Sequence, residues 1–279
     1  MNRSAWVIPA LFAMAALAAS ARATTIGPDA YGYIATDVPY AWVELEGTLG
    51  VQTWSPGSPD NFVKVANMGF SFPFYGSTDN WVRFSTNGLI TFGQDNDQAG
   101  NVDLSAEAPA VDKPSIAPLW DDWYSEKVYY NTLGSTGSRR FVVQWEDIGL
   151  GPSGSMGRVT FEAILYEATG DILFQYQDVV IEGSDGSHDN GKSATVGIRD
   201  TLGHTNGENL QWSYNQPLIA SRQAIQFSII PEPVTLAGMV LGAGSLVGYV
   251  RRRRAGGGPN AGLEIAAAET RGPRRGPTW

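Results

Sequence analysis

The chain has 279 residues, no cysteine, two histidines and a formal net charge of −9. The lack of cysteine excludes thiol catalysis and cysteine-ligated metal sites, and the acidic balance argues against nucleic acid and anionic polysaccharide as simple electrostatic partners. Most of the acidity lies in residues 24–230, which carry about 25 Asp and Glu against about 10 Lys and Arg, whereas the segment that follows is basic.

Residues 1–23 have the pattern of a secretory signal peptide. Arg3 gives a positive start, residues 6–19 form an apolar stretch too short to span a membrane, and Ala21-Arg22-Ala23 offers an A-x-A cleavage site. The sequence therefore predicts an N-terminal signal helix that engages the export translocon. Cleavage by signal peptidase at Ala21 and Ala23 would place the mature start near Thr24.

Residues 24–230 predict one all-β domain, which is long enough to bury a substantial core without disulfides. Alternating apolar runs bounded by Gly, Pro, Asn and Asp recur, and no window has a clean helical spacing of apolar residues. We expect a two-sheet antiparallel β-sandwich, jelly-roll-like, in preference to a barrel. The clearest strands are 70–74, 81–85, 89–92, 115–119, 128–133, 140–145, 159–166, 172–176, 194–198 and 224–229.

One of these runs shows the alternation especially well. Phe141, Val143 and Trp145 share one face, and Gln144 and Glu146 share the other. This pattern is typical of a half-buried antiparallel strand, with Trp145 in the core.

The Asn87-Gly88 hairpin can be predicted to its register. A three-residue loop pairs Phe84 with Ile90 and leaves Arg83 opposite Thr91, so apolar and polar side chains segregate, whereas a two-residue loop mixes them on both faces. Gly88 is then expected at positive φ in a bulge.

Several motifs in this domain carry a family resemblance. MGFSFPFYG at 68–76, FSTNGLITFG at 84–93 and IAPLWDD at 116–122 look like a β-sandwich module of secreted bacterial peptidases and surface proteins that is loosely similar to nidogen-type domains. Further stretches match within 63–227, and residues 25–60 fall outside the resemblance. It implies an accessory or adhesive module and supplies no catalytic residue.

Several polar residues in the loops are candidates for catalytic or metal-binding sites. Asp121 and Asp122 follow a strand end, and adjacent strand residues point to opposite faces, so the two carboxylates do not easily converge on one substrate. We therefore favour a turn and hydrogen-bonding role for them. Ca²⁺ binding is the alternative, and a glycosidase acid/base pair is the least favoured. The loop 95–100 lacks the closing acidic ligand of a calcium loop. His188 and His204 lie in polar turns without the motifs of a hydrolase. We therefore predict no catalytic residue, no cofactor and no metal site.

Tryptophan is the stronger indication of binding. Trp54 and Trp123 lie in loop-like contexts, where an exposed indole could stack on a sugar ring. We nevertheless favour the interpretation that these large aromatic side chains close the ends of the sandwich, with sugar stacking as the alternative.

The C-terminal part begins with Pro231-Glu232-Pro233, followed by an uncharged apolar run and by Arg251, Arg252, Arg253 and Arg254. The run, 234–250, is about 25 Å long as a helix, so it predicts a single transmembrane helix, and the arginines orient it with residues before Pro231 outside the cytoplasm. This order in 231–254 resembles the PEP-CTERM sorting tail of Gram-negative bacteria, which implies an exosortase as partner. An ordinary single-pass anchor is the alternative. Residues 255–279 predict a disordered basic extension.

The sequence thus favours a non-catalytic exported protein that is anchored in the inner membrane until processing and then resides at the cell surface or in the extracellular matrix. A carbohydrate-binding module that recognises exopolysaccharide is the alternative. A glycoside hydrolase is a third, weaker reading.

Overall fold

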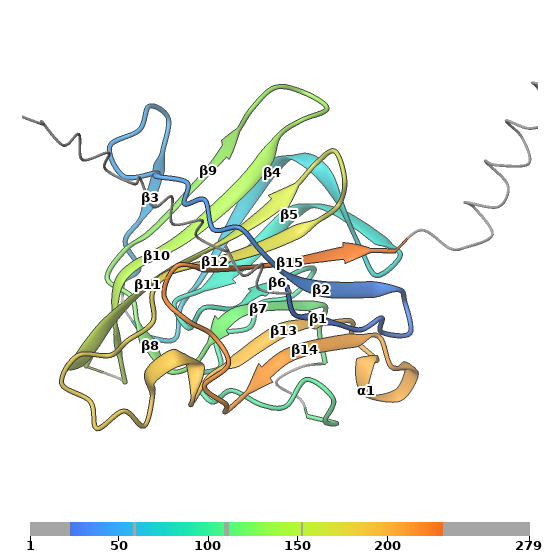
Figure 1. Ribbon diagram of the computed structural model, residues 1–279. Coiled ribbons are helices and arrows are strands. Elements are labelled where there is room, and N and C mark those ends of the chain that lie inside the picture. The colour runs from blue at the N-terminus through green and yellow to red at the C-terminus, as the bar shows by residue number, and fades with distance from the viewer. Residues whose placement is uncertain (1–22, 58–59, 109–111, 152, 231–279) are drawn as a thin grey trace, which may run out of the picture. The chain divides into compact units, whose positions relative to one another are not determined.

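The computed structural model describes residues 23–57, 60–108, 112–151 and 153–230, and nearly all regular structure in these ranges is β-strand (Figure 1). The strands are β1 (Thr25–Ile26), β2 (Tyr33–Val38), β3 (Gln52–Trp54), β4 (Val63–Phe74), β5 (Ser77–Ser85), β6 (Ile90–Thr91), β7 (Ser115–Trp120), β8 (Trp123–Tyr124), β9 (Val128–Leu133), β10 (Arg140–Leu150), β11 (Met156–Tyr166), β12 (Ile172–Asp178), β13 (Thr195–Arg199), β14 (Asn209–Tyr214) and β15 (Gln223–Ile229). The described helices are the 3-10 turn η2 (Asp189–Gly191) and α1 (Gly203–Asn206).

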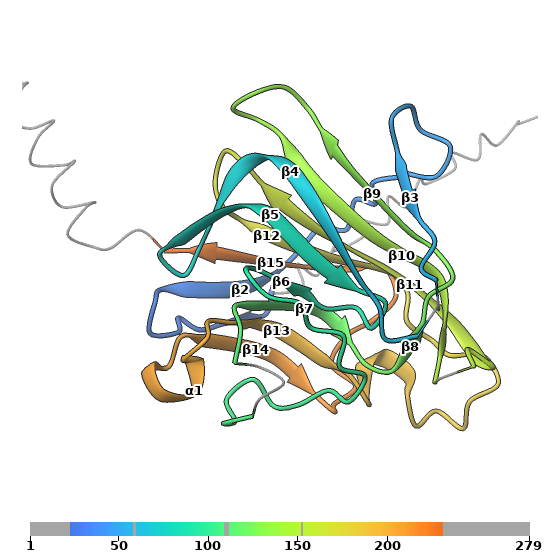
Figure 2. The same ribbon diagram turned by 180° about the vertical axis from the view of Figure 1, so that it is seen from behind.

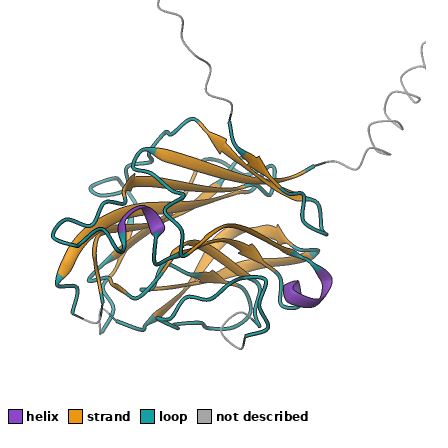
Figure 3. Ribbon diagram, turned by 60° about the horizontal axis from the view of Figure 1, so that its bottom comes forward, coloured by secondary structure: helices purple, strands orange, loops and turns teal. Residues whose placement is uncertain are grey.

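The strands form two antiparallel sheets, which Figure 3 shows as two layers. The nine-stranded sheet has the order β1-β2-β15-β12-β11-β10-β9-β3, with β8 paired to β10. The six-stranded sheet has the order β14-β13-β7-β6-β5-β4, which can be followed from bottom to top in Figure 2. The predicted two-sheet antiparallel sandwich is confirmed.

All ten predicted strands overlap observed ones, and the strand predicted at 128–133 has the bounds of β9, although the ends of the others differ. The run predicted at 140–145 continues to the end of β10, and the one predicted at 89–92 shortens to β6. Five observed strands are not predicted from the sequence: β1, β2, β3, β8 and β14. Three of them, β1, β3 and β8, have only two or three residues, and β14 lies at a sheet edge. The strand β2 lies inside its sheet, but only Tyr33 and Ala35 of its six residues are buried, so its apolar alternation is weak.

The inward faces of the two sheets form one aromatic-rich core. Trp145 on β10 is fully buried, stacks on Phe161 at 5.0 Å between ring centroids and donates its Nε1–H to the Ser85 carbonyl at 2.8 Å. The core position predicted for Trp145 is therefore confirmed. Its indole N–H has a partner, as a buried tryptophan needs.

The hairpin between β5 and β6 has the predicted register. Arg83 pairs with Thr91 and Phe84 with Ile90, and Gly88 has φ +72°. A Cβ at Gly88 would lie 2.3 Å from the carbonyl oxygen of Leu119 on β7, so glycine is required for two reasons: its φ and its close approach to another strand.

A segment that follows β2, residues 39–46 and here called the strap, crosses the outer face of the nine-stranded sheet (Figure 1). Leu45 on the strap is fully buried and packs in a cluster with Tyr129, Val142 and Ile164, whose side chains belong to that outer face. The sheet therefore has a second, smaller core outside the sandwich.

Polar side chains beneath the strap form a row, because Gln144 on β10 pairs with Glu162 on β11, and Glu162 pairs with Gln175 on β12. Gln175 and the strap residue Ala41 exchange two hydrogen bonds: the Ala41 N–H donates to Oε1 at 2.7 Å, and Nε2 donates to the Ala41 carbonyl at 2.8 Å. Gln144 donates to the carbonyl of Val43. The prediction that Gln144 faces solvent is wrong, because the strap covers it and its backbone groups replace water.

The loop between β6 and β7 covers the outer face of the six-stranded sheet in a similar way. Leu104 from this loop packs with Leu89, Ala117 and Trp120, and the Trp120 Nε1–H donates to the loop carbonyl of Gln98 at 2.8 Å. Both sheets are thus covered on part of their outer faces by irregular segments.

The N-terminal and C-terminal predictions lie largely outside the described residues. Those residues contain no helix that is long and apolar enough to cross a membrane. The predicted signal helix, the predicted membrane span at 234–250 and the extension at 255–279 are not among them.

Candidate functional site

The loop of the β5–β6 hairpin and the end of β7 meet at a buried polar junction around Asn87. Its Nδ2 donates to Asn61 Oδ1 and to the Asp97 carbonyl, both at 2.8 Å, and its Oδ1 accepts the Trp123 N–H at 3.0 Å. Both side-chain groups of Asn87, the Nδ2 amine and the Oδ1 carbonyl, thus form hydrogen bonds to neighbouring segments of the chain. The junction is therefore structural.

Asp121 lies beside this junction and is nearly buried. Its Oδ1 accepts the Asp122 N–H at 2.8 Å, and its Oδ2 accepts the hydroxyl of Ser193. Burial raises the pKa of Asp121 to about 6, and the hydrogen bonds from Ser193 and Asp122 oppose that rise. Burial also raises the pKa of Asp122, and the nearby Asp60 adds to this effect. The contacts of Asp121 match the turn and hydrogen-bonding role that the sequence favours.

The hydrogen bonds of Ser193 bear on hydrolase chemistry. Since its hydroxyl proton goes to Asp121, Ser193 can only accept from His188, whose Nδ1 lies 2.8 Å away. In a catalytic triad the histidine takes the proton of the serine and the carboxylate orients the histidine, so this order is reversed. The second imidazole, His204, accepts a hydrogen bond from Arg199 at 2.8 Å between Nδ1 and Nη2.

No group of three or more His, Asp or Glu side chains is placed to hold a metal ion in the part of the chain that the structure describes. The loop 95–100 instead begins with an ion pair, in which Asp95 Oδ1 lies 2.9 Å from Arg83 Nε. The cation-binding alternative for Asp121 and Asp122 therefore lacks a ligand cluster there.

The two tryptophans proposed for sugar stacking have different positions. Trp123 is in β8 and is buried, and its Nε1–H donates to the Leu119 carbonyl at 2.7 Å. Its indole is therefore not available for sugar stacking, in keeping with the favoured interpretation that it is a packing residue. The residues that surround Trp123, such as Phe161 on β11, are far from it in the sequence, so its burial could not be predicted from the neighbouring residues. Trp54 in β3 is half-buried and lies edge-on to Phe84 at 5.7 Å. Among the tryptophans that the structure describes, the exposed one is Trp81 on β5, with 46% of its surface accessible.

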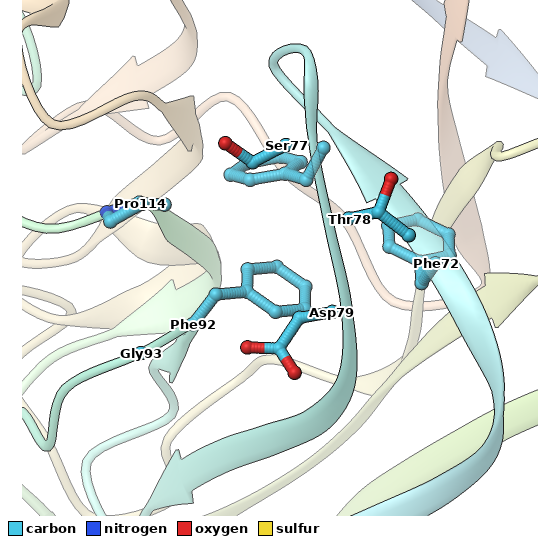
Figure 4. A pocket seen from close by; sticks show the side chains of 8 residues that line it. Phe72, Ser77, Thr78, Asp79, Phe92, Gly93 and Pro114 are labelled. Carbon is cyan, nitrogen blue, oxygen red and sulfur yellow. The ribbon is translucent and has the colours of Figure 1, made fainter.

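A pocket of about 190 Å³, here called the phenylalanine pocket, lies where β5 runs past the end of β6 (Figure 4). The rings of Phe72 and Phe92 stack at 6.1 Å with 9° between their planes, and Phe74 lies 5.2 Å from Phe92. Asp79 on β5 brings a carboxylate to this apolar wall (Figure 4). The lining residues are Phe72, Phe74, Ser77, Thr78, Asp79, Phe92, Gly93 and Pro114.

The sequence motifs contain the phenylalanines of this pocket but do not predict the pocket itself. The available signal was the polar run Ser77-Thr78-Asp79 at the start of a strand that pairs with the phenylalanine-rich end of β4. Predicting the pocket would also have required knowing that β6 ends after two residues. A short strand of this kind has no clear pattern in the sequence.

Glu162, the middle member of the row beneath the strap, is also not predicted from the sequence. It accepts hydrogen bonds from Gln144 and Gln175 at 2.7 and 2.6 Å and from the Val43 N–H at 3.2 Å. Burial raises the pKa of Glu162 to about 7 against the effect of these donors. Glu162 lies on the outer face under the strap, away from any second carboxylate in the row.

Of the predicted N-terminal and C-terminal site residues, Ala23 is exposed at the start of the described residues. The others lie outside them: Ala21, Pro231, Glu232, Pro233, Arg251, Arg252, Arg253 and Arg254.

Comparison with known proteins gives one match. A family model described as NIDO related matches residues 32–235, which includes β2 through β15 and extends the similarity upstream of the 63–227 range that the motifs indicated. Neither the curated proteins nor the solved structures that were compared with the chain give a match.

Proposed function

Because the chain belongs to the NIDO-related family, we propose that it is a non-catalytic β-sandwich module that serves in the cell envelope or extracellular matrix. The observation that carries the proposal is the family match over 32–235, which spans both sheets. The sandwich would act as a structural or adhesive unit.

The hydrogen bonds of the polar groups support the non-catalytic part of this proposal. Ser193 gives its proton to Asp121, and His204 accepts from Arg199, so these side chains stabilise loops. Glu162, the carboxyl group with a pKa near 7, is covered by the strap and cannot reach a substrate without displacing it.

The exported location rests on the sequence. The signal peptide pattern in residues 1–23 would direct the chain to the export translocon and signal peptidase. The Pro231-Glu232-Pro233 motif, apolar run and Arg251–Arg254 cluster would hold it in the inner membrane until an exosortase processes it. The mature sandwich would then remain at the cell surface or in the matrix.

Mass spectrometry of the mature protein from its native host tests this proposal. We expect an N-terminus near Thr24 and a C-terminus near Pro231. Recovery of a chain intact through Trp279 would contradict sorting and leave a plain membrane anchor, and a chain that retains Met1 would contradict export.

Binding of exopolysaccharide is the second candidate function, and the exposed indole of Trp81 favours it. We expect Trp81→Ala to weaken retention on the host's exopolysaccharide. Met156→Ala is the matched control, because Met156 has a similar exposed fraction, 47%, and lies on the other sheet. Equal retention of both variants and the parent would contradict stacking at Trp81.

A further inference from the structure

We propose that the phenylalanine pocket binds an ammonium group on a short alkyl stem, with the carboxylate of Asp79 as its counter-charge. This site is independent of the family assignment and of the sorting signal. The inference rests on the composition of the pocket wall, on the bonding state of Asp79 and on the charge of the domain.

The wall of the pocket suits an apolar stem. Phe72 is fully buried and Phe92 is 7% exposed, so the stacked and tilted rings pack against one another as an apolar wall. An alkyl stem would contact the small part of this wall that is exposed, and the charge would be met by Asp79. Pro114 closes the pocket on the other side with a further apolar surface.

The carboxylate of Asp79 has an unused oxygen. Its Oδ1 accepts the Trp81 N–H at 2.9 Å, which fixes the side chain on the β5 edge. The described residues form four ion pairs, and none includes Asp79. Its Oδ2 accepts no hydrogen bond from any described residue, so a positive donor is the group that would complete the site.

The competing ligand classes fit less well. An anion would meet the Asp79 carboxylate and the acidic field of a domain with about 15 more acidic than basic side chains. A neutral sugar presents hydroxyl groups on every side, and the pocket supplies hydrogen-bonding side chains only from Ser77, Thr78 and Asp79 on one strand. An alkylammonium ion needs one carboxylate and an apolar wall, which is what the pocket contains.

The test uses the full chain labelled with ¹⁵N-phenylalanine and titrated with n-butylammonium while NMR shifts are recorded. We expect the signals of Phe72, Phe74 and Phe92 to move together and to saturate at millimolar ligand. The neutral analogue 1-butanol should bind about tenfold more weakly, because it lacks the charge that Asp79 attracts.

Two variants separate the local carboxylate from the overall charge. Asp79→Asn keeps the acceptor for the Trp81 N–H and should weaken n-butylammonium about tenfold. Asp147→Asn makes the same change of charge at an exposed site whose φ of +52° asparagine also adopts, and it should change binding less than twofold. Unchanged affinity in Asp79→Asn, equal binding of 1-butanol, or no shift of the three phenylalanines would each overturn the proposal.

The source of the ammonium group is tested in the same way. An acetyl-Gly-Lys-Gly-amide peptide is compared with its norleucine analogue, which has the same apolar stem without the charge. Binding of both n-butylammonium and the lysine peptide supports a partner protein as the source, and binding of n-butylammonium without binding of the peptide supports a small free amine. Binding of the norleucine peptide as tightly as the lysine peptide would overturn charge recognition.

Discussion

Replacing Gly88 by alanine tests how closely the β5–β6 hairpin approaches β7. The added Cβ would lie 2.3 Å from the Leu119 carbonyl oxygen and 3.0 Å from Cζ of Phe161, both in the interior. Because the first contact is with backbone, rotation of a side chain cannot relieve it. The hairpin or β7 would have to move.

The expected cost has two parts. A non-glycine residue at a φ of +72° costs about 1–2 kcal/mol, and forcing an extra methyl group into a packed interior costs about 1–3 kcal/mol. Gly88→Ala should therefore lose about 2–5 kcal/mol from a domain whose total stability is of order 5–15 kcal/mol. Gly93→Ala is the matched control, because its φ is +76° and an added Cβ would meet nothing within 4 Å.

Urea unfolding followed by tryptophan fluorescence measures both variants. We expect Gly93→Ala to lose only the conformational part, about 1–2 kcal/mol, and Gly88→Ala to lose clearly more. Equal losses in the two variants would refute the close approach of Gly88 to Leu119 and the register that produces it.

Three further predictions concern buried polar groups. Burial raises the pKa of Asp121 from 3.8 to about 6, so between these pH values the folded state keeps a proton that the unfolded state releases. The free energy of unfolding should therefore fall by at most about 3 kcal/mol as pH rises from about 4 to about 6. Unfolding curves of Asp121→Asn across this range should lack that fall. Asn87→Ala removes three hydrogen bonds and leaves Asn61 Oδ1 and the Asp97 carbonyl without the donor that Asn87 supplies, whereas the Trp123 N–H keeps its bond to the Asp121 carbonyl at 2.9 Å. It should cost about 2–4 kcal/mol in urea unfolding, and a loss below about 1 kcal/mol would contradict the structural role. Gln175→Ala should speed hydrogen exchange at the Ala41 amide and leave the amides of β10 protected, whereas unchanged exchange would show that the strap is held without Gln175.

The hairpin shows what could be predicted from the sequence. Its register follows from local information alone, since Phe84 and Ile90 must share the buried face and Arg83 and Thr91 the other. The same local alternation located the long strands of both sheets. Where an element is short, as in β8, the pattern has too few residues to show which face is buried, so Trp123 was expected in a loop.

The row beneath the strap shows why the remainder could not be predicted. Gln144 and Gln175 occupy positions that alternation assigns to solvent, but the groups that bury them come from Val43 and Ala41, 101 and 134 residues away in the chain. The bonding capacities fit together in a specific way: each glutamine donates to a strap carbonyl and also to Glu162, and the carboxylate, which only accepts, lies between them. A polar residue buried by backbone groups has the same sequence signature as one facing water. The assignment of these polar positions therefore depends on the path of the strap, which local periodicity does not contain.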